Sequence, residues 1–218
     1  MKKSLLKIYK TLLKHFGYRN WWPAKTKIEI IIGAILAQNT NWKNVELAIS
    51  NLREAKVLSY KGLQETPVDQ LAELIRPSGY YNVKAQKLKT FVEFLSEEFS
   101  GSLMMMFREE TSILRDKLLS VKGIGPETAD SILLYAGQHL VFVSDLYTYR
   151  VMTRHKLLPE KADYHQIQKF FQDNIPEDID LYNDFHAQIV TVGAKYCNKT
   201  PKCEECPLRE FLPIEQSE

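Results

Sequence analysis

Two closely spaced glycines are the first residues of this sequence whose type and spacing could do chemistry. Gly123 and Gly125 flank one apolar residue, Ile124, and precede Pro126, which suits the first turn of a helix. Glycines at such a turn let backbone amides face outward, and amides at a helix N-terminus attract a phosphate. A plain corner between two helices needs the same residues, so the glycines alone favour neither interpretation.

A lone acid, Asp145, follows the hydrophobic run 140–143 and precedes a new helical repeat. An aspartate at such a place commonly caps the N-terminus of a helix. The whole order of glycine hairpin, helix, apolar run and aspartate resembles the helix–hairpin–helix and catalytic aspartate of the endonuclease III superfamily of DNA glycosylases. The resemblance implies that Lys122, Gly123, Ile124 and Gly125 bind a DNA phosphate, and that Asp145 is the catalytic residue facing the sugar of a flipped-out nucleotide. An N-cap aspartate can serve both purposes.

The residue two places after the second hairpin glycine is Glu127. Members of the family that also cleave the strand carry a lysine there, whose amine forms a Schiff base with the sugar. A carboxylate cannot form an imine. The resemblance therefore predicts a monofunctional glycosylase without lyase activity. Glu127 on its own is also an ordinary first-turn acid that complements the helix dipole.

Further upstream, a polar loop and several aromatic residues match the same family. Gln38 falls where the family places a glutamine in the DNA gap left by the extruded base, and an amide suits an unpaired base because it both donates and accepts. Trp21, Trp22, Pro23 and Trp42 are predicted to wall the base pocket, although tryptophans more often fill a core. Lys84 is interpreted as a solvated lysine or a contact to the DNA backbone.

The apolar pattern predicts an all-α protein. Helices are expected over 3–16, 25–37, 42–55, 67–75, 82–99, 111–120, 146–156, 163–174 and 179–194. By resemblance, residues 22–132 form a central helical lobe that contains the helix–hairpin–helix (about 111–137). Residues 1–21 and 133–218 form a second lobe, with a DNA-binding cleft between the two. The methionines at 104–106 are expected to fill the core.

Composition restricts the class of protein only loosely. The chain has 218 residues, 44% of them hydrophobic, and a net charge of +2. No apolar run is long enough to span a bilayer, and no signal peptide is recognisable. We therefore expect a cytoplasmic monomer with double-stranded DNA as its partner. Residues 1–30 are rich in lysine, which fits either a DNA-facing surface or a solvated amphipathic helix.

All three cysteines lie near the C-terminus. Five residues separate Cys197 from Cys203, and two separate Cys203 from Cys206. The family often carries a 4Fe-4S cluster on four cysteines here, but the first gap is one residue short and Leu212 occupies the fourth position. Three outcomes stay open: a cluster with a foreign fourth ligand, a different metal, or a site that has lost its metal. His186 is the imidazole considered nearby, and its helical apolar neighbours indicate a structural role.

The sequence supports one leading function and two alternatives. The leading hypothesis is a base-excision-repair DNA glycosylase that hydrolyses the bond to an alkylated purine such as 3-methyladenine. An electron-rich indole attracts a cationic base, and the weakened bond of such a lesion needs little acid catalysis. The alternatives are an endonuclease III-like glycosylase for oxidised or mismatched pyrimidines, and a non-catalytic helix–hairpin–helix DNA-binding protein. Asp145 argues against the last of these.

Overall fold

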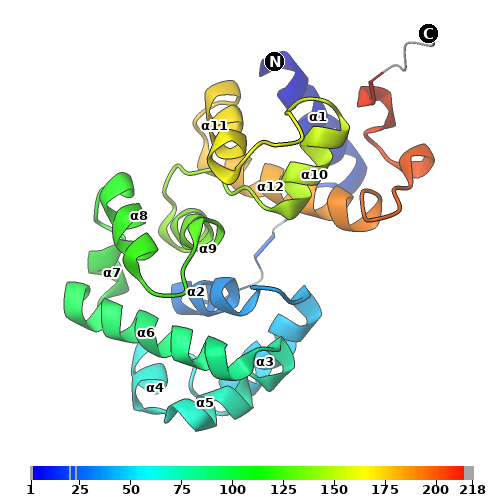
Figure 1. Ribbon diagram of the computed structural model, residues 1–218. Helices are drawn as coiled ribbons and strands as arrows, with labels where there is room; N and C mark the ends of the chain where they lie inside the picture. Colours follow the sequence, from blue (N-terminus) through cyan, green and yellow to red (C-terminus); the bar gives the residue numbers. More distant parts are fainter. Residues whose placement is uncertain (1, 20, 23, 214–218) are drawn as a thin grey trace. The chain divides into compact units, whose positions relative to one another are not determined.

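The computed structural model describes residues 2–19, 21–22 and 24–213, and every regular element within these ranges is helical (Figure 1). The chain divides into two compact units. We call Trp22–His139 the central unit, and Met1–Trp21 together with Leu140–Glu218 the terminal unit. The all-α prediction is confirmed.

The central unit is built around a buried helix, α2. Its helices are α2 (Lys27–Leu36), α3 (Trp42–Glu54), α4 (Tyr60–Glu65), α5 (Val68–Leu74), η1 (Arg76–Ser78), α6 (Tyr81–Phe99), α7 (Leu103–Met106), α8 (Thr111–Ser120), α9 (Pro126–Ser131) and η2 (Ile132–Gly137). Helix α2 contacts α3, α6, α9 and η2, because nearly all of its side chains are apolar (Figure 1). Ile31, Ile35 and Leu36 are completely buried. The helices of the hairpin therefore rest on a rigid core.

The central unit extends to His139, beyond the lobe boundary at residue 132 that the sequence indicated. The helix that begins at Pro126 continues without interruption as a π-helical turn, η2. Its apolar residues Ile132–Ala136 are buried and packed on α2. Gln138, with a φ of 59°, ends this helix.

The terminal unit packs the N-terminal helix against two helices of the C-terminal half, which also contact a third. It contains α1 (Lys2–Phe16), α10 (Leu146–Arg154), α11 (Tyr164–Asn174) and α12 (Ile179–Lys195), followed by the short turns η3 (Cys203–Glu205) and η4 (Arg209–Phe211). Phe142 stacks on Phe171 with ring centroids 4.1 Å apart, and Phe185 meets Phe171 edge-on. This aromatic core fixes the segment that leads into Asp145.

Helix α12 also holds the chain that follows α1. The buried Asp184 accepts a hydrogen bond of 2.7 Å from the Arg19 backbone N–H. Gln188 donates to the Gly17 carbonyl over 2.8 Å. Gly17 has a φ of 70°, which a side chain would disfavour. These bonds fix the exit of α1 against α12.

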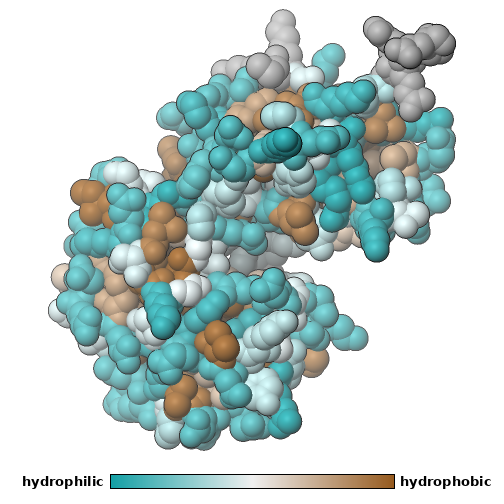
Figure 2. Space-filling view, in the orientation of Figure 1, coloured by the Kyte–Doolittle hydropathy of each residue, from teal (hydrophilic) through white to brown (hydrophobic). Residues whose placement is uncertain are grey.

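Within the described ranges, no helix is both long and apolar enough to cross a bilayer. The face seen in Figure 2 is mostly hydrophilic, with small and separate hydrophobic patches. Met104 and Met105 are more than half exposed and only Met106 is buried, so the core prediction for these methionines is wrong for two of the three.

Candidate active site

Asp145 caps the N-terminus of α10, as the sequence predicted. One carboxylate oxygen, Oδ1, accepts hydrogen bonds from the Thr148 backbone N–H at 2.7 Å and from the Thr148 hydroxyl at 2.9 Å. The other oxygen, Oδ2, lies 3.6 Å from Nε2 of His186. The Asp145 side chain is 12% exposed. The carboxylate is therefore sheltered but keeps some access to solvent.

The contacts of Asp145 favour its charged form. Burial alone would raise the pKa of this carboxyl group. The nearby imidazole of His186, together with the hydrogen bonds from Thr148, outweighs burial and holds the pKa of Asp145 below its usual value. Asp145 is thus an ionised carboxylate at neutral pH. Such a group stabilises positive charge that develops on a bound molecule.

His186 is a residue whose role the sequence did not reveal. It lies on α12, which packs along α10, and its ring meets Phe142 edge-on at 6.4 Å. Its side chain is 7% exposed. The structural role expected for His186 is incomplete, because the ring also contacts the carboxylate of Asp145. A histidine on the apolar face of a helix was the only available signal, and it is a weak one.

The two hairpin glycines serve different purposes. Gly123 has a φ of 96°, and a Cβ there would lie 2.7 Å from the side chain of Lys87. Gly125 has a φ of −95°, and a Cβ built there meets no atom within 4 Å. Gly123 is required by the conformation of the turn, whereas Gly125 leaves the surface open to a close neighbour. The side chain of Ile124 is buried, so only its backbone can face a ligand.

Gln38 is fastened to this hairpin. Its Nε2 donates to the Gly123 carbonyl at 3.0 Å and to the Thr128 hydroxyl at 2.9 Å. Its Oε1 accepts a hydrogen bond from the ammonium group of Lys87. The Gln38 side chain, which was assigned to the DNA gap, thus stabilises the hairpin. It would have to break these hydrogen bonds before it could enter the DNA.

A hollow opens beside the hairpin on the first turns of α6. It is lined by Asn82, Val83, Gln86, Lys87, Thr90, Lys122 and Gly123. Lys122 is exposed, as the predicted DNA contact requires. Two lysine side chains and two side-chain amides form a surface suited to a phosphate. Lys87 was not among the residues singled out from the sequence.

Lys84, in contrast, does not reach the surface. Its side chain is buried, and its ammonium group donates to the carbonyls of Leu36 at 2.8 Å and Ser78 at 2.7 Å. Burial and the neighbouring Lys87 lower the pKa of Lys84 to about 8. The interpretation of Lys84 as a solvated or DNA-contacting lysine is wrong: it ties the end of α2 to η1.

An aromatic cluster occupies the central unit near the start of α3. Trp22 meets Trp42 edge-on with ring centroids 5.2 Å apart, and the Tyr135 ring lies 4.8 Å from Trp22. Trp22 also covers Gly33, where a Cβ would lie 3.2 Å from the indole. The structure therefore brings two of the four predicted pocket residues together and adds Tyr135. Trp21 lies in the terminal unit, and Pro23 falls outside the described residues.

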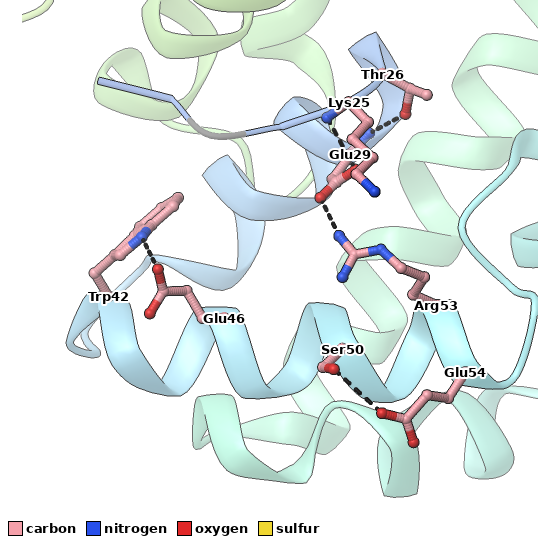
Figure 3. Close-up of polar contacts among 8 residues, drawn as sticks. All are labelled: Lys25, Thr26, Glu29, Trp42, Glu46, Ser50, Arg53 and Glu54. Carbon is pink, nitrogen blue, oxygen red and sulfur yellow. Dashed lines mark hydrogen bonds and ion pairs between the residues drawn. The ribbon is translucent and has the colours of Figure 1, made fainter. Parts of the chain in front are cut away.

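The position of Trp42 is fixed by polar contacts along α3 (Figure 3). Its Nε1 donates to Glu46 one turn later, at 3.1 Å. Arg53 pairs with the buried Glu29 of α2 at 2.5 Å, which holds α3 against the core. The Arg53–Glu29 pair thus fixes the helix that carries Trp42, and the bond to Glu46 orients its indole.

The three cysteines are free thiols that line one cavity in the terminal unit. Cys197 is buried and the other two are half-buried. Within the part of the chain that the structure describes, no three His, Cys, Asp or Glu side chains are grouped closely enough to hold one metal ion.

The chain is similar to several known proteins. A family model described as "HhH-GPD superfamily base excision DNA repair protein" matches residues 32–177. A Methanocaldococcus jannaschii protein named as a DNA repair glycosylase is 46% identical over 210 residues, which cover 96% of each chain. Endonuclease III of Sulfolobus acidocaldarius is 28% identical over 83% of this chain and 79% of its own length.

Solved structures agree with these relatives. The H. pylori 3-methyladenine DNA glycosylase MagIII, bound to 1,N6-ethenoadenine, is 32% identical, with a TM-score of 0.77 over 89% of this chain and 97% of that one. A DNA complex of endonuclease III gives a TM-score of 0.83 at 20% identity, over 97% of this chain and 95% of that one, which is a likeness of fold.

Proposed function

This chain belongs to the HhH-GPD superfamily of base excision DNA repair proteins and is a DNA glycosylase, and we propose that it releases alkylated purines such as 3-methyladenine without cleaving the strand. The observation that carries the choice of lesion is the aromatic cluster of Trp22, Trp42 and Tyr135. The similarity to MagIII supports the same choice. Double-stranded DNA is the proposed partner, bound by a monomer.

The proposed chemistry begins with extrusion of the damaged nucleotide from the helix. As the base leaves, positive charge develops on the sugar, and the ionised carboxylate of Asp145 stabilises it. His186 and Thr148 keep that carboxylate charged and fixed in direction. Water then completes the hydrolysis.

The aromatic cluster suits a cationic base. An N-alkylated purine carries a positive charge, and the faces of indole and phenol rings attract cations by about 0.5–2 kcal/mol. The carboxylate of Glu46, hydrogen-bonded to the Trp42 indole, adds negative charge next to this cluster. A neutral oxidised pyrimidine would gain less from the same surroundings.

Glu127 supports hydrolysis without a Schiff base. It is exposed in the first turn of α9, at the position where the lyase members of the family carry lysine. A carboxylate there has no nucleophilic amine to offer. Borohydride trapping should therefore give no covalent adduct with lesion-containing DNA. Efficient trapping would contradict the monofunctional mechanism and direct attention to Lys122 and Lys195.

We propose that the hairpin binds the DNA backbone through Lys122 and the amides around Gly125. Lys87 and the α6 hollow extend this surface. Gln38 is proposed to fill the gap left by the extruded base, in which case three intramolecular hydrogen bonds are exchanged for bonds to the unpaired partner base.

Single-turnover base release tests the proposed substrate. The full chain is incubated with duplexes that contain 3-methyladenine, an oxidised pyrimidine or a uracil mismatch, and we expect the fastest release from the alkylated duplex. Trp42→Ala should slow that release roughly ten- to a hundredfold, because one cation-binding face is lost. Trp42→Phe retains an aromatic face and serves as the matched variant, with a smaller loss.

Thermal midpoints of both Trp42 variants separate a pocket wall from a structural residue. A normal rate in a destabilised Trp42→Ala protein would contradict the proposed pocket. Faster release of an oxidised pyrimidine by the unmodified chain would favour the endonuclease III-like alternative.

A further inference from the structure

One cavity in the terminal unit is lined by four side chains of the types that commonly bind metals. Cys197 follows α12, Cys203 and Cys206 lie in and after η3, and His155 ends α10. All four line the same cavity, and Leu212 closes it with an apolar side chain. Three of these residues were singled out by the sequence, and the tertiary structure adds the histidine.

One ring nitrogen of His155 is buried without a hydrogen-bond partner among the described residues. The side chain is buried, and its ring is hydrogen-bonded to the backbone carbonyl of Phe211. The other nitrogen, Nδ1, is buried and has no hydrogen-bond partner among the described residues. A buried polar atom of this kind calls for a partner that completes it. A metal-binding histidine has this pattern, since one nitrogen holds the metal and the other donates to a carbonyl.

Two arginines of α10 form hydrogen bonds with Cys197 and the residues around it. Arg154 places Nη1 3.3 Å from the Cys197 sulfur and donates to the Asn198 carbonyl at 2.8 Å. Arg150 donates to the Cys197 carbonyl and, over 3.1 Å, to that of Gly193. The Arg154 guanidinium thus donates both to the Cys197 sulfur and to the carbonyl of the residue that follows it. The loop that carries Cys197 is thus fixed to the helix that carries His155.

The number and type of donors match those that an iron–sulfur cluster requires. A zinc ion binds each thiolate at about 2.3 Å and so draws its ligands close together. The described residues contain no group gathered to that degree. An iron–sulfur cluster is larger and binds its four protein ligands at separate irons. Three thiolates and one imidazole around a single cavity match that requirement.

We propose that Nδ1 of His155 takes the place of the missing fourth cysteine and completes a 4Fe-4S cluster site with Cys197, Cys203 and Cys206. A bound cluster would cross-link the loop 197–206 to the end of α10. His155 follows the last residue of α10, and Asp145 caps the first. The metal site therefore anchors one end of the helix whose other end carries the catalytic carboxylate.

Metal analysis of the full chain tests this ligand set. We expect about four iron atoms per chain after anaerobic reconstitution with iron and sulfide, together with an electron paramagnetic resonance signal in the reduced state. His155→Ala should lower the bound iron at least about tenfold. His165→Ala, which alters an exposed histidine of the same unit, should keep it.

Two cysteine variants keep the test valid if His155→Ala folds poorly. His155→Ala combined with Leu212→Cys should recover iron binding, because it restores the family's fourth thiolate. His155→Cys should keep the iron but lower the midpoint potential, since imidazole ligands raise the potential relative to thiolates.

Three results would overturn the proposal. One is an unmodified chain that binds no iron after reconstitution, and another is a chain that binds one zinc instead. The third is an unchanged iron content and resonance spectrum in His155→Ala. None of these readouts depends on glycosylase activity, so failure here leaves the proposed function untouched.

Discussion

Two sheltered aspartates, Asp130 and Asp145, illustrate the difference between a carboxylate that supports the fold and one that is available for chemistry. Asp130 has a completely buried side chain, and both of its oxygens are bound by Arg115, at 2.7 and 3.0 Å. Asp145 is 12% exposed, and Nε2 of its neighbour His186 stands 3.6 Å from only one oxygen.

The difference lies in how completely each charge is neutralised by its own protein. The bidentate ion pair with Arg115 joins α8 to α9 and binds both carboxylate oxygens of Asp130. Asp145 is kept ionised by weaker contacts, which leave it able to respond to positive charge on a bound molecule. A looser pairing in a less enclosed place therefore distinguishes Asp145, the carboxylate proposed to be catalytic, from Asp130.

Removing Asp130 should have the largest effect, and it should act on stability. Asp130→Ala leaves the Arg115 guanidinium without its buried counter-charge, which costs about 3–5 kcal/mol. For a chain of this size the thermal midpoint should fall by roughly 6–20 °C. Below the new midpoint, base release per folded molecule should stay within a few-fold of the original. A folded variant without activity would contradict the purely structural role.

Asp145→Asn should have the opposite signature. Loss of the charge should slow base release by about 10²–10³-fold, comparable to removing one preorganised electrostatic group from an active site. Asparagine caps a helix nearly as well as aspartate, so the thermal midpoint should change little. Single-turnover release and binding to abasic-analogue DNA are the measurements. An unchanged release rate in a stable variant would show that Asp145 is not catalytic.

His186→Gln should change the pH dependence rather than abolish activity. The contacts of His186 lower the pKa of Asp145 in the folded protein, so the active ionised form persists until the pH falls through that lowered value. Without the histidine, burial acts with less opposition and the pKa rises, so activity should be lost at a higher pH than in the original chain. At pH 7 the loss should not exceed about twofold while the pKa stays at or below 7.

The same shift has a consequence for stability. A carboxyl group with a lowered folded-state pKa stabilises the fold above its unfolded pKa, and this contribution is lost as the pH falls through the folded value. His186→Gln should therefore reduce the stability gained between acid and neutral pH. If the base-release rate and the stability fall at the same acid pH in the original chain and in His186→Gln, the pairing of His186 with Asp145 is contradicted.

Thr148→Val should have the smallest effect in this series. It removes the hydroxyl bond to Asp145 and keeps the backbone N–H bond, so the stability loss should be about 1 kcal/mol. Base release should slow by less than about tenfold, because the carboxylate keeps its charge and most of its orientation. If Thr148→Val slowed base release as much as Asp145→Asn does, the orientation of the Asp145 carboxylate would matter as much as its charge.

The sequence predicted well the features that depend on local chemistry. Helical periodicity placed α3 and α11 within a residue of their observed bounds, and the N-cap role of Asp145 is confirmed. Asn41 caps α3, and its side chain accepts a hydrogen bond from the Asn44 backbone N–H. Caps and periodic apolar faces can be recognised because the interacting groups lie within a few residues of each other.

Burial was harder to predict for single residues. Lys84 and Met104 were assigned to the wrong environments, since a lysine is normally solvated and a methionine normally buried. The carbonyls that hold Lys84 come from α2 and η1, far along the chain. Average preferences of a residue type cannot report such partners.

The sequence by itself determined the helical fold, the glycine hairpin, the capping aspartate and the three cysteines, because each follows from a short pattern. Only the tertiary structure decided that His186 contacts Asp145, that Tyr135 joins Trp22, and that His155 faces the cysteine cavity. These pairs are joined by helix packing across long stretches of chain. Which faces of two helices meet depends on how all the core side chains pack together, and a local pattern does not contain that information.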